Sequence, residues 1–227
     1  MFYYDNTYGL VLIGILFTVV VQIYMTNTFN KYQNVRSNIN ISAAEVAKRI
    51  MNANGIYDVV IGRVHGNMTD HYSPLKKELN LSDSTINSNS IASIGVAAHE
   101  VGHAIQDNEK FSFLVLQMAI TPTLSFISKC SIPVLFIGFI FGSLNLIRLG
   151  MYAFIATLIY QLLTLPIEFD ASRRAINTLR DLQILDENEL YGAKRVLNAA
   201  AMTYVAAAAV TALQLLRFSL LFGRRRD

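Results

Sequence analysis

The stretch that decides the fold is Phe111 to Pro166, which reads FSFLVLQMAITPTLSFISKCSIPVLFIGFIFGSLNLIRLGMYAFIATLIYQLLTLP. Its only charged residues are Lys129 and Arg148, and it is too long for a single membrane span of about 20 residues. By length it suits two tilted or extended helices that turn near Gly142-Ser143-Leu144-Asn145. The sequence therefore predicts a helical hairpin in the membrane over residues 111–167.

The composition of the chain supports a membrane protein. Of its 227 residues, 53% are hydrophobic and only 15% are charged, which is too apolar for an ordinary soluble domain. The formal net charge is only +3 and no nucleic-acid signature is present, so we expect the lipid bilayer and no nucleic acid as a partner. The single cysteine, Cys130, lies in an apolar stretch and is interpreted as a packing residue.

Two further apolar runs lie on either side of the hairpin. Tyr8 to Met25 has no basic segment before it and no small-residue cleavage site after it, so it is predicted to be a retained anchor. Asn198 to Phe222 is the last apolar run, and Arg224-Arg225-Arg226 follows it. Together with the hairpin, these runs predict about four membrane helices.

The stretch from Thr26 to Lys110 has the mixed composition of a soluble domain. Ser42-Ala43-Ala44-Glu45 has the spacing of a capping box, and the helix after it is expected to end near Asn54-Gly55. The runs Tyr57 to Val64 and Leu75 to Leu81 favour a pair of strands. The sequence therefore predicts a small α+β domain beside membrane helices.

A metal-binding motif lies near the end of this polar stretch. Ser88-Asn89-Ser90 can cap a helix from about Ile91 to Ile105, and this helix contains His99-Glu100-Val101-Gly102-His103. Helical spacing puts residues i and i+4 on one face, so the two imidazoles can bind one Zn²⁺. The glutamate beside the first histidine can take a proton from zinc-bound water, which makes Glu100 the expected base and not a ligand.

A third zinc ligand has to come from elsewhere, and Glu168 is the best candidate. It begins the first polar segment after the apolar hairpin, although a carboxylate there could equally be a solvated charge at the end of a span. Asp170 is a second possible ligand, or an acceptor that orients a histidine ring. Glu168 can reach His99 and His103 only if an even number of spans separates them.

Three motifs stand in order along the chain: Thr69-Asp70-His71-Tyr72-Ser73-Pro74, Ala97 to Gln106, and Leu165-Pro166-Ile167-Glu168-Phe169-Asp170-Ala171-Ser172-Arg173-Arg174-Ala175. The Ala-rich stretch from Leu197 to Ala207 follows them. In this combination the chain resembles the YugP-type neutral zinc metallopeptidases of bacterial membranes over most of its length.

The resemblance implies a single-zinc endopeptidase, with His99, His103 and Glu168 as ligands and Glu100 as the catalytic residue. The chain is more distantly similar to the HtpX and CAAX prenyl endopeptidase families, which also have membrane helices before the ligand glutamate. Those families tend to have an aspartate four residues after that glutamate, where this chain has Ser172. The resemblance also implies a zincin-like catalytic domain in a multi-pass protein of the bacterial plasma membrane.

Several other polar residues have more than one interpretation. His71 is either a structural turn residue or a contact for substrate, and Leu75 to Leu81 is either an ordinary strand or an open edge for an extended peptide. Neither Tyr72 nor Tyr191 can be assigned as a transition-state donor from spacing alone. The group Arg173, Arg174 and Arg180 is suited to lipid headgroups, to acidic side chains or to an oxyanion.

Basic residues also bear on the orientation in the membrane. By the positive-inside rule, the basic residues that flank spans on the catalytic side favour a cytoplasmic location for the catalytic domain. They are Lys31, Arg36, Lys110, Arg173, Arg174 and Arg180. The basic triplet Arg224-Arg225-Arg226 argues against this assignment if all four spans cross fully. Either the last helix does not cross, or the orientation is reversed.

The sequence as a whole predicts a membrane-bound zinc metalloendopeptidase that cleaves peptide bonds, in membrane proteins or their juxtamembrane segments, by Glu-activated zinc-bound water. The alternatives are a catalytically silent zinc-binding scaffold or sensor, and a zinc hydrolase of lipids or other amides. The predicted parts are an anchor over 1–25, a catalytic domain over 26–110, the hairpin over 111–167, a helix with the third ligand over 168–196, and a C-terminal membrane helix with a basic tail over 197–227.

Overall fold

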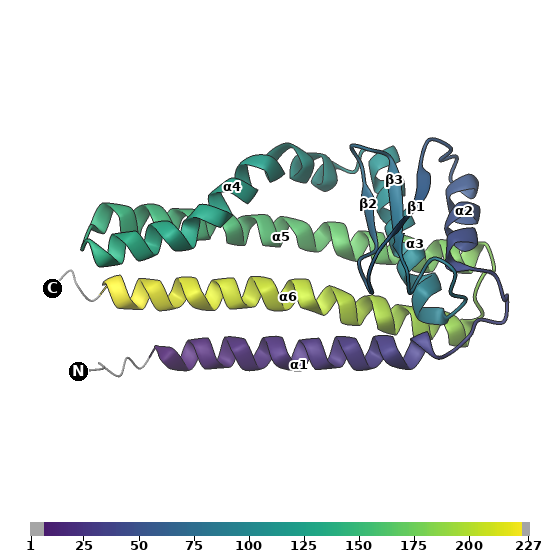
Figure 1. The fold of residues 1–227 in the computed structure, drawn as a ribbon, viewed down its shortest axis with the longest axis horizontal. Helices are drawn as coiled ribbons and strands as arrows, with labels where there is room; N and C mark the ends of the chain where they lie inside the picture. Colours follow the sequence, from purple (N-terminus) through teal and green to yellow (C-terminus); the bar gives the residue numbers. More distant parts are fainter. Residues whose placement is uncertain (1–6, 224–227) are drawn as a thin grey trace. The chain divides into compact units, whose positions relative to one another are not determined.

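The computed structural model describes residues 7–223, which form six helices and one three-stranded sheet (Figure 1). The triplet Arg224-Arg225-Arg226 therefore lies outside the described residues. The elements are α1 (Tyr8–Gln33), α2 (Ala43–Ala53), β1 (Val60–Val64), β2 (His71–Ser73), β3 (Glu78–Ser82), α3 (Ile91–Asn108), α4 (Ser112–Ile140), α5 (Leu144–Asp181) and α6 (Glu187–Gly223).

The chain divides into two compact units. The first, called the membrane unit here, contains residues 7–22, Leu116–Leu165 and residues 203–223 of the described part of the chain. The second, called the catalytic unit, contains Ile23–Val115 and Pro166–Met202. Helices α1, α5 and α6 each contribute residues to both units.

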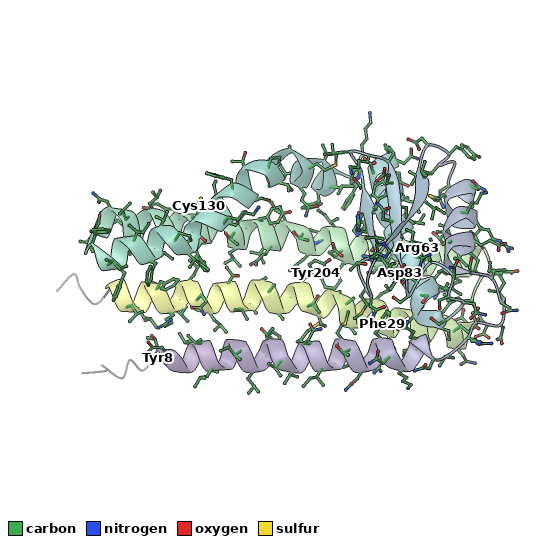
Figure 2. The ribbon with its side chains drawn as sticks, in the orientation of Figure 1. Tyr8, Phe29, Arg63, Asp83, Cys130 and Tyr204 are labelled. Carbon is green, nitrogen blue, oxygen red and sulfur yellow. The ribbon has the colours of Figure 1, made fainter. Side chains whose placement is uncertain are left out.

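The membrane unit is made of apolar helices that contact one another through small and hydroxyl side chains. Within residues 7–223, four helices are long and apolar enough to cross a membrane, namely α1, α4, α5 and α6, as the sequence predicts. The Ser128 hydroxyl of α4 lies 2.8 Å from that of Thr157 of α5, and the Phe154 ring of α5 meets the Phe218 ring of α6 edge to face. Cys130 is half-buried on α4 (Figure 2).

Helices α4 and α5 form the expected hairpin. The first ends at Ile140 and the second begins at Leu144, so the turn lies at the predicted place. Gly142 has a φ of +62°, a left-handed conformation that glycine adopts without steric cost. Gly138 and Gly150 let the two helices approach closely, because a side chain at either would meet Ile147 or Leu135 of the opposite helix.

The helix predicted over residues 168–196 is divided differently in the structure. Helix α5 continues through Pro166 to Asp181, so Glu168 lies within a helix that begins in the membrane unit. A turn follows, and α6 then begins at Glu187. The carboxyl groups of Asp186 and Glu189 each accept a hydrogen bond from the other residue's backbone N–H, both 2.9 Å long. This reciprocal cap explains why a new helix begins at that point.

Helix α2 begins and ends where the sequence predicts. The Ser42 side chain caps its first turn by accepting a hydrogen bond of 3.2 Å from the backbone N–H of Glu45. Gly55, with a φ of +70°, ends it. One face of α2 packs against α3 in the core of the catalytic unit, where Val46, Ile50, Ile94 and others are fully buried.

The sheet contains both predicted strands, but in a different arrangement. Its order is β1-β3-β2, with β1 parallel to β3 and β2 antiparallel to it. The pair is parallel because residues 65–77 cross over before β3 begins, and part of this connection forms β2 itself. His71, for which the sequence leaves open a turn position or a contact with substrate, lies on strand β2 and not in a turn. Of the two interpretations of Leu75 to Leu81, the ordinary strand is confirmed and the open edge is wrong, because β3 is paired on both sides.

Polar contacts hold the sheet to the chain that leads into α3. Arg63 on β1 forms an ion pair of 2.5 Å with Asp83, the residue after β3, and both are labelled in Figure 2. The Asp70 carboxylate, just before β2, accepts hydrogen bonds from the Ser82 backbone, the Ser82 hydroxyl and the Thr85 hydroxyl. The segment before α3 is therefore fixed to the sheet.

Candidate metal centre

Helix α3 holds both histidines of the motif on one side. Ser90 caps it, accepting a hydrogen bond of 3.1 Å from the backbone N–H of Ser93, as the sequence predicts. The His99 and His103 rings are one helical turn apart, with centroids 4.7 Å from each other and planes nearly perpendicular. Their side chains are only 14% and 15% exposed, so the pair lies in a nearly closed site.

Glu168 of α5 lies against both rings. Its Oε2 is 3.3 Å from Nε2 of His99, and its Oε1 is 3.8 Å from Nε2 of His103. One ligand atom from each of the three side chains falls within 4.8 Å of the others. Tetrahedral zinc with bonds of about 2.1 Å would separate its ligand atoms by roughly 3.4 Å. Two imidazoles and one carboxylate at these distances fit a zinc ion.

Each ring has a hydrogen-bond partner on its other nitrogen. Nδ1 of His99 lies 3.1 Å from the Ser172 hydroxyl, and Nδ1 of His103 lies 3.0 Å from Oε1 of Gln106. An amide oxygen only accepts, so Nδ1 of His103 is the donor in this bond, and Nε2 is the ring nitrogen that faces Glu168. The partners fix the orientation that a zinc ligand needs.

Asp170 does not touch either histidine directly. Its buried carboxylate accepts a hydrogen bond of 3.0 Å from Nε2 of Gln106, and Gln106 in turn contacts His103. Arg173 and Arg174 also donate to Asp170, and Arg174 reaches Glu109 at 2.7 Å. Asp170 therefore acts on the candidate metal site through Gln106, and Arg174 is committed to acidic side chains.

Helices α3 and α5 approach each other closely at the metal site. A Cβ atom added to Gly102 would lie 2.5 Å from the backbone oxygen of Ala171. The side-chain amide of the fully buried Gln106 donates a hydrogen bond of 2.8 Å to the backbone carbonyl of Ile167. The absence of a side chain at position 102 thus allows Glu168 to reach the two histidines.

Glu100 points into the buried part of the catalytic unit. Glu100 is only 8% exposed, and burial raises the pKa of its carboxyl from 4.5 to about 7. The carboxyl also accepts a hydrogen bond from the backbone N–H of Tyr72 on β2, an edge strand of the sheet. A bound divalent cation would lower this pKa again, since it favours the charged form. A carboxyl held in this way can accept and return a proton near neutral pH.

The side chains of the other residues that the sequence singled out have partners outside this group. The Tyr72 hydroxyl donates to the Asp107 carboxylate at 2.7 Å, and burial together with this bond raises the pKa of Tyr72. His71 is exposed, and its ring lies 2.9 Å from the backbone oxygen of Thr69. The Tyr191 hydroxyl accepts a hydrogen bond from Arg195. These contacts give none of the three a direct part in the metal site.

Gln106 and Ser172 are the functional residues that the sequence analysis missed. Both lie within one helical turn of a proposed ligand, since Gln106 follows His103 by three residues and Ser172 follows Glu168 by four. Because residues three or four positions apart share one face of a helix, this spacing could have indicated both residues from the sequence. In the sequence Ser172 stands out only as a departure from the aspartate of related families, yet its hydroxyl lies 3.1 Å from Nδ1 of His99.

Replacing Gln106 with leucine is expected to weaken zinc binding. The change leaves Nδ1 of His103 and the Asp170 carboxylate without the amide that joins them, in a site that excludes water. Loss of such an outer partner typically lowers metal affinity about 10- to 100-fold. Competition with a chromogenic chelator measures the affinity, and unchanged binding would show that the amide does not orient the ring.

Taken together, the four apolar helices and the His99, His103 and Glu168 group define a membrane protein with a metallopeptidase-type site. Comparison with known proteins agrees. Residues 7–223 match the family described as “Putative neutral zinc metallopeptidase”, and the chain belongs to this family. It is 44% identical over 207 residues to the “Putative membrane protease YugP” of Bacillus subtilis (strain 168), covering 91% of this chain and 92% of that protein. No solved structure matches the chain.

Proposed function

We propose that this protein is a zinc-dependent endopeptidase that hydrolyses peptide bonds of membrane proteins. The observation that carries the proposal is the convergence of His99, His103 and Glu168 beside the buried carboxyl of Glu100. A purely structural zinc site would have no use for an additional acid there, and it would usually close the fourth coordination position with histidine or cysteine.

His99 and His103 would hold zinc through Nε2, and Glu168 through a carboxylate oxygen. When bound, zinc supplies a Lewis acid that polarises a carbonyl group and lowers the pKa of a water molecule. Ser172 and Gln106 keep the two rings turned toward the site. The nearly closed surroundings limit the access of bulk water and strengthen electrostatic interactions with the substrate.

Glu100 would act as the general base and then as the general acid. Its carboxyl would take the proton from the attacking water and deliver it to the nitrogen of the departing amine. The hydrogen bond from the Tyr72 backbone limits the rotation of this carboxyl, so that it faces one direction. This bond also ties the position of the base to strand β2.

The proposed substrate class follows from the position of Glu168. The run from Leu149 to Ile167 contains no charged residue, and Glu168 is the next residue of the same helix. A peptide bond close to the membrane surface would thus reach the site most easily. The test compares two substrates with the same cleavage sequence, one next to a membrane anchor and one in a soluble protein. The anchored substrate should be cleaved faster, and equal cleavage rates would contradict this assignment.

Replacing Glu168 with glutamine tests the function most directly. The amide lacks the charge of the carboxylate, so zinc affinity should fall by more than the ~10- to 100-fold typical of outer partners, and hydrolysis should stop. Elemental analysis of the purified full chain measures bound zinc, and cleavage of casein measures activity. Glu187→Gln is the matched control, because that side chain is 81% exposed on α6 and should change neither quantity.

The outcomes separate the proposal from its alternatives. One zinc ion in the wild type with no hydrolysis of any substrate would favour a zinc-binding scaffold or sensor. If lipids or small amides were hydrolysed in preference to peptides, the assignment of the zinc site would stand and the proposed substrate class would be wrong. Full zinc content in Glu168→Gln would remove Glu168 from the ligand set.

We also propose that the catalytic unit faces the cytoplasm, as the basic residues near the spans favour. Tyr57 is 79% exposed in this unit, so a cysteine introduced there in a Cys130→Ser background can report its side. An impermeant maleimide should label it in inverted vesicles and not in intact cells. Labelling in intact cells would reverse the orientation.

A further inference from the structure

The catalytic unit contains a cavity of about 220 Å³ between α5 and α6. It is formed by one face of α5 and the facing turn of α6. Its lining combines three cations, three uncharged polar side chains and three apolar ones. These are Arg173, Arg180 and Lys194, then Ser172, Asn177 and Asn198, and then Phe169, Ile176 and Leu197.

The charge of the lining favours an anion. Three of its side chains are positive and none is a carboxylate, while the two asparagine amides add further donors. Arg173 donates from one guanidinium nitrogen to Asp170. Because a guanidinium has five N–H donors, others remain for a ligand. Arg180 is 3.6 Å from Glu187, but both side chains are more than half exposed, so this pair is weak.

Along both helices, the cavity lies next to the end of a long uncharged run. On α5 the uncharged run ends at Ile167, and on α6 the uncharged run from Val196 to Leu216 begins two residues after Lys194. At about 1.5 Å per residue, each run is long enough for a hydrocarbon core of about 30 Å. Arg173 and Lys194 therefore lie within roughly 10 Å, along their helices, of the end of an uncharged run that is long enough to enter the bilayer. Phe169 and Leu197 line the cavity next to these cations.

We propose that this cavity binds the headgroup phosphate of an anionic phospholipid. Arg173 and Lys194 donate to the unesterified phosphate oxygens, and a guanidinium can do so with two parallel bonds. Arg180, at the outer end, contacts the rest of the headgroup. Apolar side chains beside the cations accommodate the glycerol and the start of an acyl chain. Basic pockets between helices at a membrane surface commonly bind anionic lipids in this way.

The lipid would lie close to the candidate metal site. Ser172 lines the cavity, and its hydroxyl is 3.1 Å from Nδ1 of His99. A bound headgroup is thus separated from a zinc ligand by a single side chain. The proposal concerns binding alone and holds whether or not the protein hydrolyses peptides.

The test uses the full chain in a neutral detergent and a fluorescent short-chain phosphatidylglycerol whose anisotropy reports binding. Unlabelled phosphatidylglycerol should displace the probe, phosphatidylcholine should do so at least tenfold less well, and inorganic phosphate should compete only at much higher concentration. Lys194→Gln and Arg173→Gln should each weaken binding about fivefold, and the double variant about 30-fold. Lys194→Arg should retain binding.

Controls keep the result specific. Lys48→Gln and Lys76→Gln remove exposed cations elsewhere in the catalytic unit and should leave the affinity unchanged. Lys194 also lies outside the contacts of the metal site, so its variant tests the cavity if Arg173→Gln disturbs Asp170. Four results would overturn the proposal. Phosphatidylcholine could compete equally well, or Lys194→Gln could bind the probe as the wild type does. Free phosphate could bind more tightly than lipid, or an acidic peptide could displace the probe more strongly than lipid.

Discussion

Glu100→Gln is expected to lower the rate of peptide hydrolysis by about 10²- to 10⁴-fold, the range in which a positioned general acid or base contributes. Glutamine has the same shape and can still accept the hydrogen bond from the Tyr72 backbone, but it cannot take a proton from water. Because Glu100 is not among the side chains that approach the metal position, zinc content should not change. Turnover of a fluorogenic peptide and elemental analysis of the same sample give both quantities.

The combination of results identifies the role of the carboxylate. Loss of activity with zinc retained assigns the proton transfers to Glu100. A variant that loses zinc as well would make Glu100 a ligand or a support of the fold. Glu45→Gln is a suitable control, since that side chain is about half exposed on α2 and pairs only with Arg49 one turn away.

Gly102→Ala is expected to disrupt the site from outside the ligand set. The new methyl group would lie 2.5 Å from the backbone oxygen of Ala171 and 3.1 Å from its carbonyl carbon. Backbone atoms cannot move away as a flexible side chain can, so α3 and α5 must separate and carry the histidines away from Glu168. Overpacking of this kind costs about 1–3 kcal/mol. We expect a lower unfolding midpoint and a loss of bound zinc.

Gly95→Ala is the matched control, because it makes the same change on the same helix. Its methyl group would meet the Ala193 side chain at 3.3 Å, a contact that a small shift can relieve. Replacing a glycine in a helix also gains about 0.5–1 kcal/mol of helix propensity, so this variant should be near neutral. If Gly102→Ala kept zinc and stability as Gly95→Ala does, the close approach of α3 and α5 would not be what assembles the site.

The sequence predicted the features that depend on local patterns. The four apolar runs gave the candidate spans, and Ser42 and Ser90 gave the starts of α2 and α3. The family was also identified correctly, because it rests on short motifs whose order survives without any knowledge of the fold. In each of these cases the information lies within one helix or one contiguous motif.

Features that depend on tertiary packing were not predictable in the same way. β2 has only three residues, and it forms a strand because it pairs with β3 and donates to Glu100. The continuation of α5 past Ile167 was not predicted, because the boundary was placed where the composition changes from apolar to polar at Glu168. Gln106 has an ordinary helical position, and only the approach of α5 gives it both Asp170 and His103 as partners.

The order of the ligands along the chain has a consequence for biosynthesis. His99 and His103 are synthesised before α4, while Glu168 follows only after α4 and most of α5. A nascent chain therefore offers zinc at most two of the three ligands until the whole hairpin has left the ribosome and entered the bilayer. Because metal binding is linked to the folding of its site, tight zinc capture comes late. If the protein has the proposed function, a growing chain would be kept from acting as a protease beside the insertion machinery until its hairpin is inserted.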